Sequence, residues 1–264
     1  MPDSAEIINS LRQRIAAVER VRADVSPCRM ATGHGAIDAA LGGGLALGGL
    51  HELFAAQQDD SGSASGFAAM LASRLLAGPI RAEGTLIWLR EAGAERRGGC
   101  LHAPGLAELG LDPGRVVLGV LDDAASLLKV ANDVVRCPDL AGAVIELWRE
   151  PRLLDLTASR RLAVAAHNAG VTVLMLRADA TPSPSAAQTR WLVAAAAAAP
   201  LDAKAPGHPT LDLTLLRQRG GRADLNWRVE WDRDTKIFRD ASLSGALLAV
   251  SGGGSLAPDQ RQAG

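Results

Sequence analysis

The stretch Gly35-Ala-Ile-Asp-Ala-Ala-Leu-Gly-Gly-Gly-Leu-Ala-Leu-Gly-Gly-Leu-His-Glu-Leu-Phe54 continues as Ala55-Ala-Gln-Gln-Asp-Asp-Ser-Gly-Ser-Ala-Ser-Gly66 and decides the fold. Glycine-rich turns precede an apolar strand at residues 49–54. A loop rich in glycine and serine then leads into a helix predicted at residues 67–76. A strand, a glycine-containing loop and a helix in this order are typical of a phosphate-binding loop, in which backbone N–H groups and a lysine hold the phosphates.

The loop lacks the lysine that phosphate binding requires. The chain contains three lysines, Lys129, Lys204 and Lys236, and none of them follows a glycine. If Gly66 is aligned with the last glycine of the motif, Phe67 and Ala68 stand in place of the lysine and the magnesium-binding hydroxyl. Neither side chain can take over those contacts.

Two carboxylates in the loop add negative charge that would repel a triphosphate. We therefore predict a degenerate phosphate loop, no ATPase activity and no bound cofactor. The loop comprises Asp59, Asp60, Ser61, Gly62, Ser65, Gly66, Phe67 and Ala68. A shifted register stays open as an alternative, because residues 62–66 could form an anion-binding nest of backbone N–H groups.

Composition places limits on fold and partners. The chain has 264 residues, 48% of them hydrophobic, and a net charge of −1, which suits one large domain and gives no overall attraction to nucleic acid. We expect an amphipathic helix at 1–24, a core domain at 25–250 and a disordered tail at 251–264. No segment is apolar for the roughly 20 residues that a membrane span needs, so we expect a cytoplasmic protein. The spacing of the cysteines and histidines predicts neither a disulfide framework nor a metal site.

Apolar segments alternate with helical ones along most of the chain. Strands are predicted at 84–89, 116–120, 142–148 and 171–176, and helices at 124–135 and 155–168. Continuous apolar strands between helices are typical of a mostly parallel sheet that is covered on both faces, so we predict the α/β class.

The two ends of the chain depart from this pattern. Leucines alternate with polar residues at 211–215, Gly220-Gly221 makes a turn, and Trp227, Val229 and Trp231 alternate again, which predicts an antiparallel hairpin appended to the sheet. We expect the edge of this hairpin and the apolar face of the N-terminal helix to be partner-binding surfaces. The helix face consists of Ile7, Leu11, Ile15 and Val18.

The order of these parts resembles the RecA superfamily core. Three further segments, His102–Pro113, Ala131–Arg136 and Ser185–Trp191, together with the hairpin, resemble the ImuA family over roughly residues 30–240. The resemblance implies a role in damage-induced (SOS) translesion synthesis and mutagenesis. It also implies an ImuB-like Y-family polymerase homologue as partner and, indirectly, a C-family error-prone polymerase.

The resemblance also points to individual residues. Glu146 lies in the strand where the superfamily has its Walker B acid. Glu91 comes after the predicted strand at 84–89, at the position where the superfamily has its water-activating carboxylate. We interpret both as structural. The loop that contacts single-stranded DNA in recombinases corresponds to Arg177–Arg190, and a second basic cluster surrounds the hairpin. Candidate DNA-binding residues are Arg177, Arg190, Arg217, Arg219 and Arg222. For the hairpin arginines we favour the simpler interpretation that they keep a solvent-facing surface soluble.

Three other functions stay open at this point. The chain could be an active RecA-like ATPase that remodels recombinase filaments, a single-stranded-DNA-binding protein, or an SOS-induced inhibitor of cell division. As an assembly protein it could also bind RecA recombinase or a second copy of itself.

Overall fold

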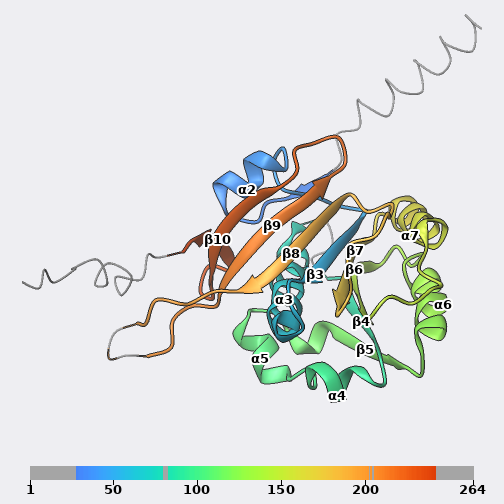
Figure 1. Cartoon of the computed structure of the whole chain (residues 1–264), viewed down its shortest axis with the longest axis horizontal. Coiled ribbons are helices and arrows are strands. Elements are labelled where there is room, and N and C mark those ends of the chain that lie inside the picture. Colours follow the sequence, from blue (N-terminus) through green and yellow to red (C-terminus); the bar gives the residue numbers. More distant parts are fainter. Residues whose placement is uncertain (1–27, 80–82, 202, 204, 242–264) are drawn as a thin grey trace, which may run out of the picture.

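The structure is a computed structural model that describes residues 28–79, 83–201, 203 and 205–241. Its main feature is a nine-stranded sheet with the order β11-β10-β9-β8-β3-β7-β6-β4-β5 (Figure 1). The strands are β3 Leu50–Ala55, β4 Thr85–Glu91, β5 Val116–Leu121, β6 Leu140–Trp148, β7 Thr172–Ala178, β8 Thr189–Ala195, β9 Thr210–Gln218, β10 Leu225–Asp232 and β11 Ile237–Asp240. The main helices are α3 Ser61–Ala77, α6 Ala124–Val134 and α7 Leu156–Ala169.

Shorter elements surround this sheet. A two-stranded antiparallel sheet pairs β1 with β2, and α2 lies between these strands in the sequence. The bounds of the short elements are β1 Arg29–Met30, α2 Gly35–Ala40, β2 Leu45–Ala46, η1 Gln58–Asp60, α4 Ala94–Gly98, α5 Ala103–Glu108 and η3 Pro113–Arg115.

One part of the sheet is parallel. Strands β8, β3, β7, β6, β4 and β5 all run in the same direction, with β3 between β7 and β8. The carboxyl ends of these strands therefore meet at a single edge of the sheet, where open α/β sheets bind their ligands. The prediction of a mostly parallel, helix-flanked α/β sheet is confirmed.

The other part is antiparallel. The predicted hairpin is formed by β9 and β10, and β9 joins the sheet by pairing with β8. The sequence did not predict β8 or β11. Strand β8 alternates buried and partly exposed residues and lies directly after a proline-containing segment without regular structure, so it lacks the apolar continuity of the other parallel strands.

The expectation that the hairpin edge would be free to bind a partner is wrong. Its apolar side chains, among them Leu213, Val229 and Trp231, are buried in the core beside α3. Its outer edge pairs with β11 over residues 229–232. The reason is that β11, at the end of the described chain, folds back to satisfy the backbone groups of β10.

Helices cover both faces of the sheet (Figure 1). Helix α3 packs on one face through Phe67, Met70, Leu71 and Leu75, and α6 and α7 cover the other face through residues such as Leu127 and Leu162. Ten of the residues of α3 are buried, so it is the central helix of the core rather than a surface helix.

Several predictions concern segments outside the described residues. These are the N-terminal helix with Ile7, Leu11, Ile15 and Val18, and the tail at 251–264. Within the described part of the chain, no helix combines the length and apolar character that crossing a bilayer requires.

Candidate functional site

The connection from β3 to α3 is the segment in which a RecA-like fold binds phosphate. After Ala55 the chain makes one 3-10 turn, Gln58–Asp60, which leads directly into α3 at Ser61. The connection is therefore tight, and most of what was predicted to be a wide loop is helix.

The carboxylate of Asp60 holds this connection closed. Its Oδ2 atom accepts a hydrogen bond from the backbone N–H of Gln57 at 3.1 Å, and its Oδ1 atom accepts one from the backbone N–H of Ala195 at 2.7 Å. Asp60 is also the residue immediately before α3, where the helix dipole favours negative charge. The carboxylate accepts no hydrogen bond from α3 itself, but its negative charge lies beside the helix N-terminus, where a phosphate would otherwise bind.

The predicted helix start at residue 67 is wrong, because residues 61–66, expected to be loop, also lie in α3. Gly62 and Gly66 sit within the helix with open space around the position of a Cβ atom, so neither makes a turn. The alternative of an anion-binding nest at 62–66 fails for the same reason. The serines and alanines of this stretch extend the helix to the 3-10 turn, and a helix with one buried face gains stability from every added turn.

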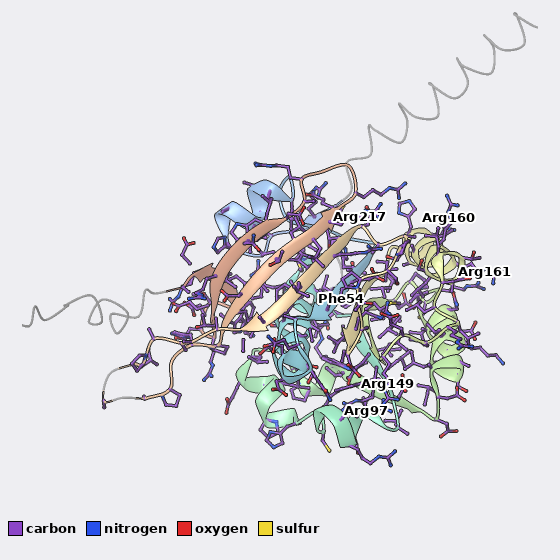
Figure 2. The ribbon with its side chains drawn as sticks, viewed as in Figure 1. Phe54, Arg97, Arg149, Arg160, Arg161 and Arg217 are labelled. Atoms are coloured by element: carbon purple, nitrogen blue, oxygen red, sulfur yellow. The ribbon has the colours of Figure 1, made fainter. Side chains whose placement is uncertain are left out.

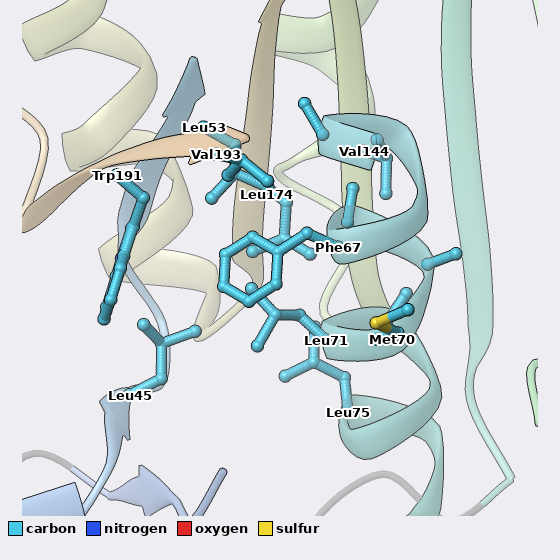
Figure 3. Packing of buried hydrophobic residues seen from close by; sticks show 14 of the residues in the cluster. Leu45, Leu53, Phe67, Met70, Leu71, Leu75, Val144, Leu174, Trp191 and Val193 are labelled. Carbon is cyan, nitrogen blue, oxygen red and sulfur yellow. The ribbon is translucent and has the colours of Figure 1, made fainter. Parts of the chain in front are cut away.

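Phe67 is part of the core and does not face the loop. Its ring lies 5.9 Å from that of Trp191, edge-on, and 5.5 Å from that of Phe238, measured between ring centroids. Figure 3 shows Phe67 of α3 extending towards Trp191. The following residue, Ala68, is fully buried. A lysine and a hydroxyl at these two positions would point into the apolar core instead of towards a nucleotide.

Glu146 lies within β6, two residues before the strand ends, and is buried. Arg90 Nη2 donates a hydrogen bond to Glu146 Oε1 at 2.9 Å. The indole N–H groups of Trp88 and Trp148 donate to the two carboxylate oxygens at 3.0 and 2.9 Å. These contacts join β4 to β6, and they leave the carboxylate surrounded by protein.

Glu91 ends β4 and reaches the carboxyl edge of the sheet. Its Oε1 atom accepts a weak hydrogen bond from the backbone N–H of Trp148 at 3.4 Å, and its Oε2 atom lies 4.0 Å from Arg97 Nη1. The guanidinium of Arg97 also lies 5.9 Å from the centre of the Trp148 ring. Figure 2 labels Arg97, in α4, and Arg149, which directly follows β6. Glu91 and Glu146 therefore lie on adjacent strands, but only Glu91 is near solvent.

Arg177 and Arg190, predicted as DNA-binding candidates, instead bind Glu52 of β3. Arg190 Nε donates to Glu52 Oε2 at 2.9 Å, and Arg177 Nη1 lies 3.7 Å from Glu52 Oε1. Arg177 is buried, its guanidinium lies 5.4 Å from the centre of the Phe54 ring, and burial lowers its pKa below the ordinary value while Glu52 opposes that shift. Arg177 is therefore withdrawn from any DNA backbone by a buried ion pair.

Sequence reasoning missed Glu52, which is the centre of this network. Ser185 Oγ donates to its Oε2 atom at 2.7 Å and accepts from Arg190 Nη2 at 2.9 Å. The network ties the segment after β7 to the central strand. A carboxylate in the apolar run Leu50–Phe54 is the signal that could have revealed it, since a buried charge needs a partner.

The arginines of the hairpin are only partly available. Arg217 Nη1 donates to the carbonyl oxygen of Ser185 at 3.3 Å, and Arg228 forms two hydrogen bonds of 2.7 Å with Asp212. Arg219 and Arg222 are exposed at the β9–β10 turn. Within the predicted basic cluster, Arg219 and Arg222 are therefore two exposed cations at the turn.

No group of three or more potential metal-ligating side chains comes together within the described ranges. At the carboxyl edge of the sheet, salt bridges and the carboxylate of Asp60 occupy the polar positions.

Comparison with known proteins agrees with this geometry. The chain is 34% identical over 194 residues to Protein ImuA of Caulobacter vibrioides, in two strains, and the match covers 69% of this chain and 74% of that protein. The chain belongs to the ImuA family. It matches no protein-family model.

The fold of this ImuA-family chain is also similar to that of a solved structure. The crystal structure of the RadB recombinase superposes with a TM-score of 0.54 at 16% identity, covering 81% of this chain and all of that one. This similarity shows a RecA-like fold. Membership of the ImuA family supports a role in the ImuA/ImuB mutagenesis system, and the likeness to the recombinase adds the fold alone.

Proposed function

We propose that this ImuA-family chain is a non-catalytic assembly protein in SOS-induced translesion synthesis, and that it binds an ImuB-like Y-family polymerase homologue. Through that homologue it would act with a C-family error-prone polymerase. The observation that carries the proposal is the carboxylate of Asp60, which bonds to two backbone N–H groups beside the N-terminus of α3. A nucleotide phosphate at that place would meet a fixed negative charge.

The other residues of the former site support the same function. The carboxylate of Glu146 is bonded to an arginine and two indoles, and Phe67 and Ala68 face the core. A fold in which these positions are used for internal contacts retains its outer surfaces for binding other proteins. Besides the ImuB-like homologue, RecA recombinase and a second copy of the chain are the partners to compare.

An ATPase assay tests the absence of catalysis. Purified protein with ATP, magnesium and single-stranded DNA is expected to show no turnover above that of the Glu91→Gln variant. Glu91 suits this comparison because its side chain is 15% exposed and makes only weak contacts, so the variant should fold. Turnover that Glu91→Gln abolishes would overturn the proposal and favour a filament-remodelling ATPase.

Co-purification tests the partner. The full chain is expected to retain the ImuB-like homologue on an affinity resin equally well with and without nucleotide. Deleting residues 1–24 and repeating the experiment tests the N-terminal apolar face. Undiminished binding would remove that helix as the contact, whereas failure of the full chain to retain the homologue would contradict the proposed partner.

A further inference from the structure

A groove with a basic rim lies between α6 and α7, away from the carboxyl edge of the sheet. Its volume is about 950 Å³. It is lined by Asn132, Arg136, Pro138, Thr157, Arg160, Arg161, Val164, Ala165, Asn168 and Ala169. The two helices pack beside each other on the same face of the sheet (Figure 1), and residues of both line the groove.

The charged side chains that line the groove are all positive. Its lining contains Arg136, Arg160 and Arg161 and no carboxylate. All three arginines are exposed, and none of their guanidinium groups forms an ion pair or hydrogen bond with another described residue. Figure 2 shows Arg160 and Arg161 on the outer side of α7. This contrasts with Arg90, Arg177 and Arg190, which each bind a carboxylate of the chain.

The floor of the groove is apolar. Val164 is 52% exposed, and Ala165, Ala169 and Pro138 lie beside it. Val164 follows Arg160 by four residues and Arg161 by three, so all three side chains share one face of α7. An exposed apolar side chain on the same helix face as two arginines, with a third arginine in the same groove, is a surface for a ligand that is both apolar and acidic.

We propose that this groove binds an acidic amphipathic helix of a protein partner, with apolar side chains on Val164 and carboxylates on Arg136, Arg160 and Arg161. A helix laid along a groove between two helices is a common mode of peptide recognition. Single-stranded DNA fits the surface less well, because the lining contains no aromatic side chain on which a base could stack. The proposal deepens the proposed function by naming a contact for its protein partner.

A binding assay with a defined probe tests the site. The probe is a fluorescein-labelled peptide as long as α7, with leucines at positions i, i+3, i+4 and i+7 and glutamates elsewhere. We expect it to bind the full chain, and to bind the Arg160→Ala/Arg161→Ala variant about tenfold more weakly or worse. Val164→Asp should weaken binding as well, because it replaces the apolar contact with a repelling charge.

Two controls separate this site from general attraction between charges. Arg222→Ala removes an exposed arginine of the hairpin turn, outside the groove, and should leave the affinity unchanged. A peptide of the same composition with its leucines scattered around the helix should bind more weakly than the amphipathic one. Because the altered side chains are exposed, each variant should keep the thermal midpoint of the wild type, measured by circular dichroism.

Three results would overturn the proposal. The first is peptide binding that the groove variants leave unchanged, and the second is no binding of the peptide at all. The third is an oligo(dT) strand that binds the chain and loses affinity in the groove variants while the peptide does not bind, which would make the groove a nucleic-acid interface. Co-purification with the ImuB-like homologue is a separate experiment. A chain that still retains the homologue would keep the proposed assembly function even if the groove does not bind the peptide.

Discussion

At the scale of single residues, several carboxylates of this ImuA-family chain accept hydrogen bonds from other groups of the chain. Asp60 bonds to backbone N–H groups beside α3, Glu146 to Arg90 and two indoles, and Glu52 to Arg190. Asp60 follows β3 and Glu146 lies near the carboxyl end of β6, where a nucleotide-binding relative would place polar groups for its ligand, whereas Glu52 lies in the middle of β3. The same residue types thus stabilise the fold.

Replacing Asp60 tests its role in closing the β3–α3 connection. We expect Asp60→Ala to lower the free energy of unfolding by about 1–2 kcal/mol, since two backbone donors lose their acceptor. Asp59→Ala is the matched control, because Asp59 is exposed and its carboxylate has no hydrogen-bond partner among the described residues. That variant should change stability by about 0.5 kcal/mol or less. Urea unfolding measures both, and equal effects would refute the role of Asp60.

His51 should make stability depend on pH. It is fully buried between Thr189 Oγ1 and the carbonyl oxygen of Ala46, each at 2.8 Å, and burial lowers its pKa to about 4 from the ordinary 6.5. At a pH between 4 and 6.5, this histidine is protonated in the unfolded chain and neutral in the folded chain. Stability should therefore fall as pH decreases from about 6.5 towards 4, by about 3 kcal/mol in total from this group.

The quantity to measure is the slope of the free energy of unfolding against pH. This slope can be determined even for a variant that is less stable overall. The slope between pH 6.5 and 4 should be smaller in His51→Gln than in the wild type. If His51→Gln keeps the full slope, the acid sensitivity has another source.

At the scale of elements, helix α3 and strand β5 differ in the burial of their apolar side chains. Helix α3 buries Phe67, Met70 and Leu71 against the sheet. Strand β5 is the last strand of the sheet, and Val117, Leu118 and Val120 are 54%, 44% and 50% exposed. The opposite edge strand, β11, carries Arg239, which pairs with Glu230 and Asp232. One edge of the sheet is thus charged and the other is apolar.

Restoring the lost motif in α3 should fail. The Phe67→Lys/Ala68→Thr variant recreates Gly-Lys-Thr in sequence, but both new side chains would enter the core between α3 and the sheet. We expect a loss of about 3 kcal/mol or more of folding free energy, because an unpaired charge is buried and an aromatic contact is lost, and no gain in nucleotide affinity. Thermal unfolding with and without ATP measures this. Stabilisation by ATP would show that the register is different.

The apolar edge at β5 should favour self-association. An unprotected edge strand without charged residues can pair with another chain. Val120→Lys is expected to reduce any concentration-dependent increase in mass, measured by sedimentation velocity. Leu201→Lys is the control, since Leu201 is 49% exposed and lies outside the sheet. Association that both variants leave unchanged would place the contact elsewhere.

At the scale of the whole molecule, a single core connects the parallel and antiparallel parts of the sheet. The apolar cluster under α3 includes Trp88 of β4 and Trp231 of β10, and β8 pairs in parallel with β3 and antiparallel with β9. The hairpin is therefore a continuation of the sheet and not a separate module. Such an arrangement predicts cooperative unfolding.

Hydrogen exchange can test that cooperativity. Backbone amides of β4 and β10 should lose protection at the same denaturant concentration, and tryptophan fluorescence and far-ultraviolet circular dichroism should give one common midpoint. Earlier loss of protection in β10 would show that the antiparallel part unfolds on its own.

Prediction from sequence succeeded where a local pattern is enough. The apolar runs of β3, β4, β6 and β7 indicated a parallel sheet, and Gly220 with its alternating neighbours indicated the hairpin. It failed at β8, whose alternation is obscured by the adjacent alanines, and at the start of α3, where serine and glycine indicated a loop. At the candidate site, it found Asp60 but not its backbone partners, and it missed Glu52.

The sequence by itself determined the α/β class, the absence of a lysine after any glycine and the membership of the ImuA family, because these depend on residue order and short-range periodicity. Only the tertiary structure decided that Asp60 reaches Ala195, that Arg177 and Arg190 bind Glu52, and that α6 and α7 leave a groove rimmed by arginines. Those contacts join residues far apart in the chain. Their partners are set by strand order and helix packing, which no local pattern contains.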